Sequence, residues 1–468
     1  MKKLRLSGKD IRRLGVDDNE TISLIKNIFQ KHYKHTPKKD VLEIISSIRA
    51  NPGKYLQKEP LNRIAAHFKE EPTRKSSPSP HSPKLEAEKP FEVFGKEYID
   101  PAALDQMHTA MQLPVSVCGA VMPDAHVGYG LPIGGVLAAR NAVLPYGVGM
   151  DIGCRMAMSI YPMEARSIDR DRKKLRKLLI TNTRFGRAEF DDRKEHPVLE
   201  RREFQEIEFL RGLQKKAFDQ LGTSGHGNHF VDIGILEIDH AQEGLGVSPG
   251  TYLTVLSHSG SRGLGAEVAR HYTSLAQKRL DLPKIARPLA WLSLDSDEGQ
   301  EYWQAMTLAG DYSAANHSEI HRRITKALGQ QPLQRIENHH NFAWLHTTPS
   351  GEQWVVHRKG ATPAQKGVLG IIPGSMASPA FIVRGKGCER SIDSAAHGAG
   401  RVMSRSQAKK TFTDKQVKKV LYDKRIELIG GGLDEAPMVY KDIRKVMELQ
   451  EDVVEIVATF YPRIVRME

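Results

Sequence analysis

A histidine near the end of the chain stands between small residues, in the segment Ser394-Ala-Ala-His397-Gly-Ala-Gly-Arg401. Small neighbours let a bulky ligand and the backbone come close to the imidazole. The arginine four positions later offers a planar fork suited to phosphate. The pattern is compatible with a histidine that meets a phosphorylated substrate as nucleophile, base or ligand, and equally with a histidine that packs in a loop.

Polar side chains that follow apolar runs could together bind metal ions. They lie in Asp151-Ile-Gly-Cys154, Gly225-His-Gly-Asn-His229, His258-Ser-Gly-Ser-Arg262 and Glu337-Asn-His339-His340. Each segment alone is more often structural than functional, but their recurrence favours a metal site whose ligands differ in hardness. Its ligands would be Asp151, Cys154, His229, His258 and His340. A shared thiolate or carboxylate could bridge two divalent ions, as two-metal phosphoryl transfer requires, and ligand softness alone leaves zinc and manganese equally open.

Two further segments suit a nucleotide. Val356-His-Arg-Lys-Gly-Ala-Thr362 concentrates cations that bind phosphate, and Ile372-Pro-Gly-Ser-Met376 predicts a tight turn with exposed backbone N–H groups. The sequence has no Gly-x-x-x-x-Gly-Lys-Ser/Thr segment, which argues against a P-loop. It also has no Lys-x-Asp-Gly, the nucleophile motif of ordinary lysine-dependent ligases.

Short apolar runs between glycine-rich loops predict the strands that position these residues. Examples are residues 134–139, 251–257 and 353–357, and helical spacing predicts amphipathic helices at 266–279 and 440–449. The mixture predicts one α+β (mixed α/β) catalytic domain over residues 90–468, with β-sheets surrounded by helices.

A small helical module is predicted for residues 1–70. Apolar residues recur at helical spacing from Glu20 to Lys34, and a second helix follows Thr36-Pro37 and stops at Asn51-Pro52-Gly53. The Pro/Ser/Lys-rich residues 71–89 cannot bury enough apolar surface to order themselves. We therefore expect a flexible linker there, at a domain boundary.

The composition favours an intracellular protein with an anionic partner. The 468 residues carry a formal charge of +13, which suits the phosphate density of nucleic acid; the alternative is a basic surface without a specific partner. Three cysteines are too few for a disulfide scaffold. The first residues lack the apolar core of a signal peptide and no segment has the length of a membrane span, so we expect a cytoplasmic protein with no membrane partner.

Together, the segments resemble the RtcB family of RNA ligases. They follow the family's order from about residue 90 to the end: Pro123-Asp-Ala-His-Val-Gly-Tyr-Gly130, Leu131-Pro-Ile-Gly-Gly135, Asp151-Ile-Gly-Cys154, Gly225-His-Gly-Asn-His-Phe230, His258-Ser-Gly-Ser-Arg-Gly-Leu-Gly265, Asn338-His-His-Asn-Phe342, His357-Arg-Lys-Gly-Ala361, Pro373-Gly-Ser-Met376 and His397-Gly-Ala-Gly-Arg-Val-Met-Ser-Arg405. Nine ordered motifs make chance similarity a poor explanation.

The resemblance implies an enzyme that joins an RNA 3′-phosphate or 2′,3′-cyclic phosphate to a 5′-hydroxyl, in RNA repair or tRNA splicing. It implies GTP and two manganese ions (Mn²⁺) as cofactors. By resemblance, His397 attacks the α-phosphate of GTP and becomes a histidine–GMP intermediate, which passes the guanylyl group to the RNA 3′-phosphate. A neutral imidazole is a competent nucleophile for such a step.

The resemblance also assigns the other site residues. The metal ligands it implies are Asp151, Cys154, His229, His258 and His340. Arg262 and Arg401 match arginines that hold RNA or nucleotide phosphates. The nucleotide contacts it implies are Asn228, Ser375, His397, Gly398, Ala399, Gly400, Tyr440 beside the guanine, and Arg466.

Several positions depart from the family pattern. Family chains usually end in Val-Lys-Gly, with the lysine on guanine, and here Arg466 is the candidate substitute. Asp232 stands in place of a glutamate, Ala380 in place of a serine that contacts the nucleotide, and His226 in place of a small residue beside the metal ligands. We expect a divergent branch of the family.

The departures keep two other functions open. One is a metal-dependent RNA end-processing enzyme on the same scaffold, such as a cyclic phosphodiesterase or a 3′-end guanylyltransferase. The other is a non-catalytic RNA-binding protein, which the intact His397 and the complete ligand set argue against. We expect a monomer, and an archease-like activator is a candidate partner.

Overall fold

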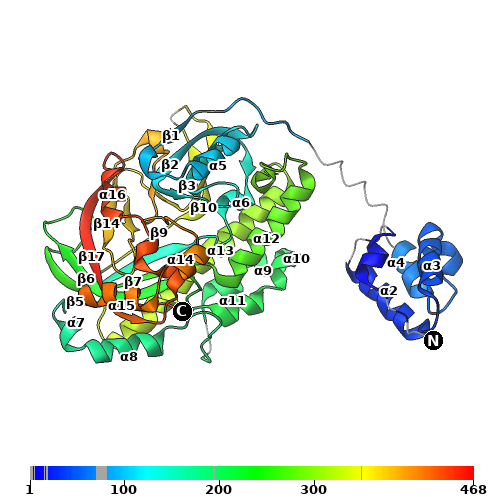
Figure 1. Ribbon diagram of the computed structural model, residues 1–468, viewed down its shortest axis with the longest axis horizontal. Coiled ribbons are helices and arrows are strands. Elements are labelled where there is room, and N and C mark those ends of the chain that lie inside the picture. The colour runs from blue at the N-terminus through cyan, green and yellow to red at the C-terminus, as the bar shows by residue number, and fades with distance from the viewer. Residues whose placement is uncertain are drawn as a thin grey trace. The chain divides into compact units, whose positions relative to one another are not determined.

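The computed structural model describes residues 4, 6–14, 16, 19–69, 82–192, 195–348 and 350–468. The chain divides into two compact units, Met1–Pro80 and His81–Glu468 (Figure 1). Among the described residues, no helix is long and apolar enough to cross a membrane.

In the described part of the first unit, helices enclose an apolar core of their own. They are α1 (Gly8–Arg12), α2 (Asn19–His32), α3 (Lys38–Ala50) and α4 (Asn62–Lys69). The core includes Ile11, Ile25, Phe29, Val41, Ile45, Ile48 and Ile64, each without exposed surface. The bounds of α2 and α3 agree with the two helices predicted from apolar spacing.

Most of the segment expected to be a linker lies outside the described residues. In its described part, the backbone N–H of Glu86 donates to Gln112 O at 2.8 Å and that of Lys89 donates to Met111 O at 3.0 Å. Residues 82–89 therefore run along the end of α5 (Pro101–Met111), within the second unit.

Two β-sheets form the framework of the second unit. The five-stranded sheet has the order β1 (Phe91–Val93), β2 (Ser116–His126), β3 (Ile133–Ala139), β11 (Gln353–Lys359), β10 (Asn341–Thr347). The larger sheet has the order β13 (Leu369–Ile372), β14 (Ala380–Gly385), β17 (Val454–Arg466), β6 (Phe230–Ile238), β7 (Gly250–Ser259), β5 (Arg155–Glu164), β9 (Gln334–His339), and β16 (Glu427–Ile429) pairs with β17.

Shorter elements surround these sheets. The small strands are β4 (Ala142–Val143), β8 (Leu292–Ser293), β12 (Ala361–Pro363) and β15 (Ser394–Ala396). The helices include α6 (Pro145–Val148), α7 (Ser167–Arg170), α8 (Arg172–Asn182), α9 (Glu203–Glu206), α10 (Glu208–Arg211), α11 (Gln214–Gln220), α14 (Arg405–Thr411), α15 (Asp414–Asp423) and α16 (Ile443–Glu448). The expected α+β class is confirmed, although the helix predicted for 440–449 is limited to α16.

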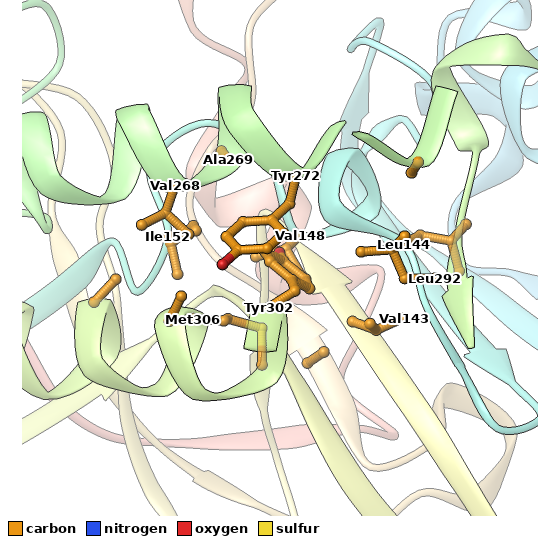
Figure 2. Packing of buried hydrophobic residues seen from close by; sticks show 14 of the residues in the cluster. Val143, Leu144, Val148, Ile152, Val268, Ala269, Tyr272, Leu292, Tyr302 and Met306 are labelled. Atoms are coloured by element: carbon orange, nitrogen blue, oxygen red, sulfur yellow. The ribbon is translucent and has the colours of Figure 1, made fainter. Parts of the chain in front are cut away.

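Two long helices cover the loop that precedes β5. α12 (Arg262–Arg279) and α13 (Asp297–Leu328) pack on each other, and Figure 2 shows Tyr272, Tyr302 and Met306 from these helices around Val148 and Ile152. All five side chains are fully buried. Burying a side chain of this size stabilises the fold by about 2 kcal/mol. The packing therefore fixes the loop that carries Asp151 and Cys154.

Candidate functional site

The predicted metal ligands come from neighbouring strand ends of the larger sheet. Arg155, the first residue of β5, pairs with Ser259 at the end of β7 and with His339 at the end of β9. Phe230, the first residue of β6, pairs with His258 on β7. Because adjacent antiparallel strands bring opposite ends together, the segments at this edge meet. They carry Asp151, Cys154, His229, His258 and His340.

These five side chains form two overlapping groups. Cys154, His258 and His340 offer ligand atoms within 4.8 Å of one another, and so do Asp151, Cys154 and His229. Cys154 Sγ lies 3.1 Å from His258 Nε2 and 3.6 Å from His229 Nε2. His229 Nε2 lies 2.9 Å from Asp151 Oδ2, and the Nε2 atoms of His258 and His340 are 3.3 Å apart. Cys154 belongs to both groups and is therefore the ligand that could bridge two cations.

The chemistry of the donor set fits divalent metal ions. Burial, with the neighbouring imidazoles, lowers the pKa of His258 to about 3 and that of His340 well below its ordinary value, so both rings are neutral. His258 Nδ1 donates to Asn228 O at 3.0 Å, which turns the Nε2 lone pair towards the cluster. Burial and the Asp151 carboxylate raise the pKa of the Cys154 thiol. Lone pairs that converge this closely repel one another unless a cation lies between them.

Two glycines allow the acidic and imidazole ligands to reach this position. A Cβ on Gly260 would lie 2.1 Å from Asp151 Oδ1, and a Cβ on Gly225 would lie 2.0 Å from His229 Nδ1. Any larger residue would displace the ligand beside it. This close approach explains the glycines in the Gly-His-Gly and Ser-Gly-Ser loops.

His397 follows β15 and is held by a buried carboxylate. Its Nδ1 donates to Asp124 Oδ2 at 2.6 Å, and its backbone N–H donates to the same oxygen at 3.2 Å. The Asp124 side chain has no exposed surface. The bond fixes the tautomer in which Nδ1 carries the proton, so the Nε2 lone pair is free for nucleophilic attack. The His397 ring lies 4.9 Å from the ring of His340, so His397 is next to the candidate metal ligands.

Asp124 is a further candidate functional residue, and the sequence alone assigns it no role. It lies within β2, in the segment Pro123–Gly130, which matches a family motif without assigning a role to any one of its residues. Its contact with His397 spans 273 residues, so periodicity and local spacing hold no sign of it. The available signal was an acidic residue among the apolar residues of a strand, because a buried carboxylate requires a partner.

A cavity opens beside His397. The residues predicted to contact a nucleotide that line it are Asn228, Ser375, His397, Gly398, Ala399, Gly400 and Tyr440. His258 also lines the cavity, so the group of candidate metal ligands borders it directly. The geometry brings an imidazole with a free nitrogen, a group of candidate metal ligands and a glycine-rich wall to one space, an arrangement that transfer of a nucleotidyl group could use.

Arg401 lines the same cavity but has partners within the protein. It donates to Asp434 O at 2.7 Å and lies 3.3 Å from the buried Glu435 carboxylate, with its guanidinium over the Tyr440 ring at 5.4 Å. Arg405 and the Tyr440 hydroxyl bond the same Glu435 carboxylate. Arg401 therefore bonds to other residues of the cavity wall as well as lining the cavity.

The structure does not bring the Arg466 side chain to the cavity. Its guanidinium bonds Leu179 O and lies 5.5 Å from the Phe185 ring, whereas the neighbouring Val465 and Met467 line the cavity. Successive side chains of a strand point to opposite faces, so the Arg466 side chain lies on the face of β17 opposite to that of Val465. Val465 and Met467 are the residues that face the cavity at this end of the chain.

Arg262 and His226 lie near the metal ligands and have protein partners. Arg262, with φ 56°, donates to Thr223 Oγ1 at 3.1 Å and to Gly186 O at 2.8 Å. His226 Nδ1 lies 2.7 Å from Glu468 Oε1. His226 belongs to neither ligand group found among the described residues, so it does not disturb them by direct ligation.

The basic run at 357–359 is not a phosphate site. Arg358 is fully buried, donates to Ser394 Oγ at 2.7 Å and Ile392 O at 3.0 Å, and lies over Trp344. Lys359 donates to two backbone carbonyls, and burial lowers its pKa to about 7. The expectation that these cations bind phosphate is wrong because β11 places them in the interior.

Comparisons with known proteins agree on one family. A family model described as tRNA-splicing ligase RtcB matches residues 106–468. The RNA-splicing ligase RtcB of Escherichia coli K12 is 34% identical over 375 residues, which cover 73% of this chain and 87% of that protein. The tRNA-splicing ligase RtcB of Nanoarchaeum equitans is 32% identical, over 73% of this chain and 86% of its own length. The RNA-splicing ligase RtcB of Mycobacterium tuberculosis is 30% identical, over 70% and 91%.

Proposed function

The chain belongs to the RtcB family, and on that premise we propose that this RNA ligase joins an RNA 3′-phosphate or 2′,3′-cyclic phosphate end to a 5′-hydroxyl end. The observation that carries the proposal is the pairing of His397 with Asp124 beside the two ligand groups that share Cys154. RNA repair and tRNA splicing are the processes that such a reaction serves.

His397 is the proposed nucleophile. Its Nε2 forms a bond to the α-phosphorus of GTP while the bond from that phosphorus to the departing pyrophosphate oxygen breaks, which leaves a histidine–GMP adduct. Asp124 holds the Nδ1 proton and stabilises the positive charge that develops on the ring. The guanylyl group then passes to the RNA 3′-phosphate, and the 5′-hydroxyl displaces GMP. A cyclic phosphate is first opened by water.

Two Mn²⁺ ions fit the two ligand groups. Cys154, His258 and His340 would hold one ion, and Asp151, Cys154 and His229 would hold the other. Bound there, the ions would neutralise negative charge on phosphate groups in the adjoining cavity. Asn228 and the Gly398–Gly400 turn line that cavity and offer polar side-chain and backbone groups to the phosphates.

A ligation assay tests the proposal. The enzyme is incubated with Mn²⁺, GTP and RNA that carries a cyclic phosphate and a 5′-hydroxyl. We expect joined RNA from the wild type and from His108→Ala, which removes an exposed histidine on α5, and none from His397→Ala. Equal joining by His397→Ala would contradict the assigned nucleophile.

An RNA end-processing enzyme is the second candidate, favoured by one observation. Met467 and Asp232 line the C-terminal end of the cavity, whereas Arg466, at the position of the family's lysine, does not, and Asp232 stands in place of a glutamate. The same assay separates the candidates, because an end-processing enzyme would yield hydrolysed or guanylylated RNA ends without joined product.

A further inference from the structure

The exposed face of α15 carries a row of basic side chains and one aromatic ring. The row follows the helical spacing i, i+3, i+4, i+7 and consists of Lys415, Lys418, Lys419 and Tyr422, all exposed. Tyr422 is 84% exposed, and among the described residues none forms an ion pair with the three lysines. Asp414 and Asp423, at the two ends of the helix, lie roughly a quarter of a turn to either side of the row. The centre of the row therefore presents three positive charges to solvent.

The opposite face of α15 packs behind the wall of the cavity. Val417 and Leu421 are buried in one apolar cluster with three residues that line the cavity, Met376, Val465 and Met467. Lys424, the residue after the helix, donates to Ala377 O at 2.7 Å, in a loop whose neighbouring residues line the cavity. Because a helix with its side chains is about 10–12 Å across, the row lies about that distance behind the cavity wall. An RNA strand with its end in the cavity can reach the row within the about 4–16 nucleotides that a single-strand site spans.

The basic surface continues from α15 onto α8. Arg176 on α8 pairs with Glu427, the first residue of β16, at 2.8 Å, and β16 follows α15 after three residues. Figure 1 shows α15 and α8 next to each other along the lower side of the second unit. Lys173 and Lys177, four positions apart on α8, are exposed. Exposed cations therefore extend from the back of the cavity wall across both helices.

Resting on the proposed RNA ligase function, we propose that the exposed row of α15 binds single-stranded RNA next to the end that enters the cavity. The ammonium groups of the three lysines neutralise phosphates of the strand, and the Tyr422 ring stacks on an unpaired base. Every base offers a face for stacking, so this surface has no preference for a sequence. It holds the strand outside the residues that carry out the reaction.

RNA affinity and its salt dependence test this proposal in the full chain. Lys415→Glu, Lys418→Glu and Lys419→Glu are combined, and the control variant carries the same change at three exposed lysines elsewhere in the second unit, Lys96, Lys284 and Lys366. We expect the first variant to bind a labelled single strand of about 16 nucleotides at least about tenfold more weakly. The slope of log affinity against log salt should fall by about 0.7 for each phosphate that the protein no longer neutralises.

Substitutions of Tyr422 separate stacking from charge. Tyr422→Ala should weaken binding of the single strand by about tenfold and leave the salt slope unchanged, whereas Tyr422→Phe keeps the ring and should keep the affinity. Formation of the nucleotide adduct without RNA should be the same in all these variants, because α15 does not line the cavity. Thermal unfolding establishes that each variant is folded before its affinity is compared.

The outcomes distinguish this proposal from the ligase function on which it rests. RNA affinity and salt slope equal to those of the control variant would overturn it. Unchanged RNA binding with abolished binding of polyglutamate would also overturn it, and would assign the row to an acidic protein instead. A wild type that binds RNA through this row but forms neither nucleotide adduct nor joined RNA would overturn the ligase function alone.

The buried amide of Asn316, on α13, supports a second, independent inference. Asn316 has no exposed surface. Its Oδ1 accepts from the backbone N–H of Gly222 at 2.7 Å, and its Nδ2 donates to Thr223 O at 2.9 Å. The same Nδ2 lies 3.1 Å from Ser259 Oγ and 3.3 Å from Gly260 O. One side chain therefore joins two separate loops.

Both loops carry candidate metal ligands. Thr223 precedes the loop that leads to His229, and Gly260 follows His258 by two residues in the other loop. Gly260 also lies against Asp151, since a Cβ on Gly260 would be 2.1 Å from Asp151 Oδ1. Asn316 itself belongs to neither ligand group, so any effect on metal ions acts through the loops.

We infer that Asn316 is a positioning residue that holds the two loops at the separation at which their histidines can bind ions sharing Cys154. An amide suits this role because its oxygen accepts from one loop while its NH₂ group donates to carbonyl oxygens of both. A carboxylate has nearly the same shape but cannot donate, so it would place an oxygen against Thr223 O and Gly260 O.

Mn²⁺ titration, followed by the electron paramagnetic resonance signal of the free ion, tests the positioning role. Asn316→Asp should weaken Mn²⁺ binding by at least about tenfold. It should raise the Mn²⁺ concentration for half-maximal adduct formation by the same factor, with the rate at saturating Mn²⁺ nearly unchanged. The control is Asn182→Asp on α8, which loses a similar bond, from Nδ2 to Leu178 O at 2.9 Å, away from the ligand loops.

Mn²⁺ affinity of Asn316→Asp equal to that of the control would overturn the positioning role. A lower rate at saturating Mn²⁺ with unchanged affinity would also overturn it. Asn316→Ser keeps one donor and is the second variant should Asn316→Asp fail to fold; it should weaken Mn²⁺ binding in the same direction, and an unchanged affinity would again contradict the inference.

Discussion

Asp124→Asn removes the negative charge that orients His397 and leaves the size of the side chain nearly unchanged. In the native protein one carboxylate oxygen accepts from His397 Nδ1 at 2.6 Å and from the His397 backbone N–H at 3.2 Å. A hydrogen bond to a charged group contributes about 1.5–3 kcal/mol. Because the ring becomes positively charged as it attacks, most of this contribution is gained in the transition state. At about 1.4 kcal/mol per tenfold change in rate, we expect adduct formation about 10- to 100-fold slower.

Single-turnover formation of the labelled nucleotide adduct measures this effect. The control is Asp105→Asn, the same substitution at an exposed position on α5. Nucleotide affinity should change little, because Asp124 does not line the cavity. A rate within threefold of the wild type, with the protein folded, would refute the orienting role of Asp124.

Three other perturbations follow from the site and its surroundings. Cys154→Ala should lower the number of bound Mn²⁺ ions from two to none, whereas His340→Ala should lose one ion. Elemental analysis after equilibrium dialysis measures the number of bound ions. Two ions bound to Cys154→Ala would contradict the role of Cys154 as a ligand shared by both ions. Arg401→Ala should lower the free energy of unfolding by about 1–3 kcal/mol because the buried Glu435 loses a partner. It should also weaken nucleotide binding. An unchanged melting temperature would contradict the loss of stability. The pKa of Lys359 is about 7 in the folded protein, against an ordinary value of 10.5. Between these two pH values the unfolded chain binds one more proton than the folded protein, so the free energy of unfolding rises with pH, by up to about 1.4 kcal/mol per pH unit. Urea unfolding measured across this range should show a smaller slope for Lys359→Met.

The sequence was sufficient to predict the α+β class and to select a set of candidate metal ligands that meet in space. Each ligand lies next to the end of an apolar run, and such ends gather at the edges of a sheet. The division into two groups was not predictable, because it depends on β5 lying between β7 and β9, which local spacing does not reveal. The roles of these residues in catalysis stay predictions.

The residues that were missed or misplaced share a physical cause. Asp124 and His397 are joined across 273 positions, so only the folded chain brings them together. Arg358 and Lys359 have side chains that suit phosphate, but their burial is set by the strands that flank β11. The Arg466 side chain bonds Leu179 O and not the cavity, because a shift of one residue along a strand moves a side chain to the opposite face.

The identity of the nucleophile is tested most directly by locating the nucleotide on the protein. The enzyme is incubated with Mn²⁺ and GTP without RNA, digested at neutral to alkaline pH, and its peptides are analysed by mass spectrometry. We predict one guanylyl group per chain, on His397, labile to acid and transferred to an RNA 3′-phosphate when RNA is added. A guanylyl group on another residue, or joined RNA from an enzyme that never carries the adduct, would contradict the mechanism.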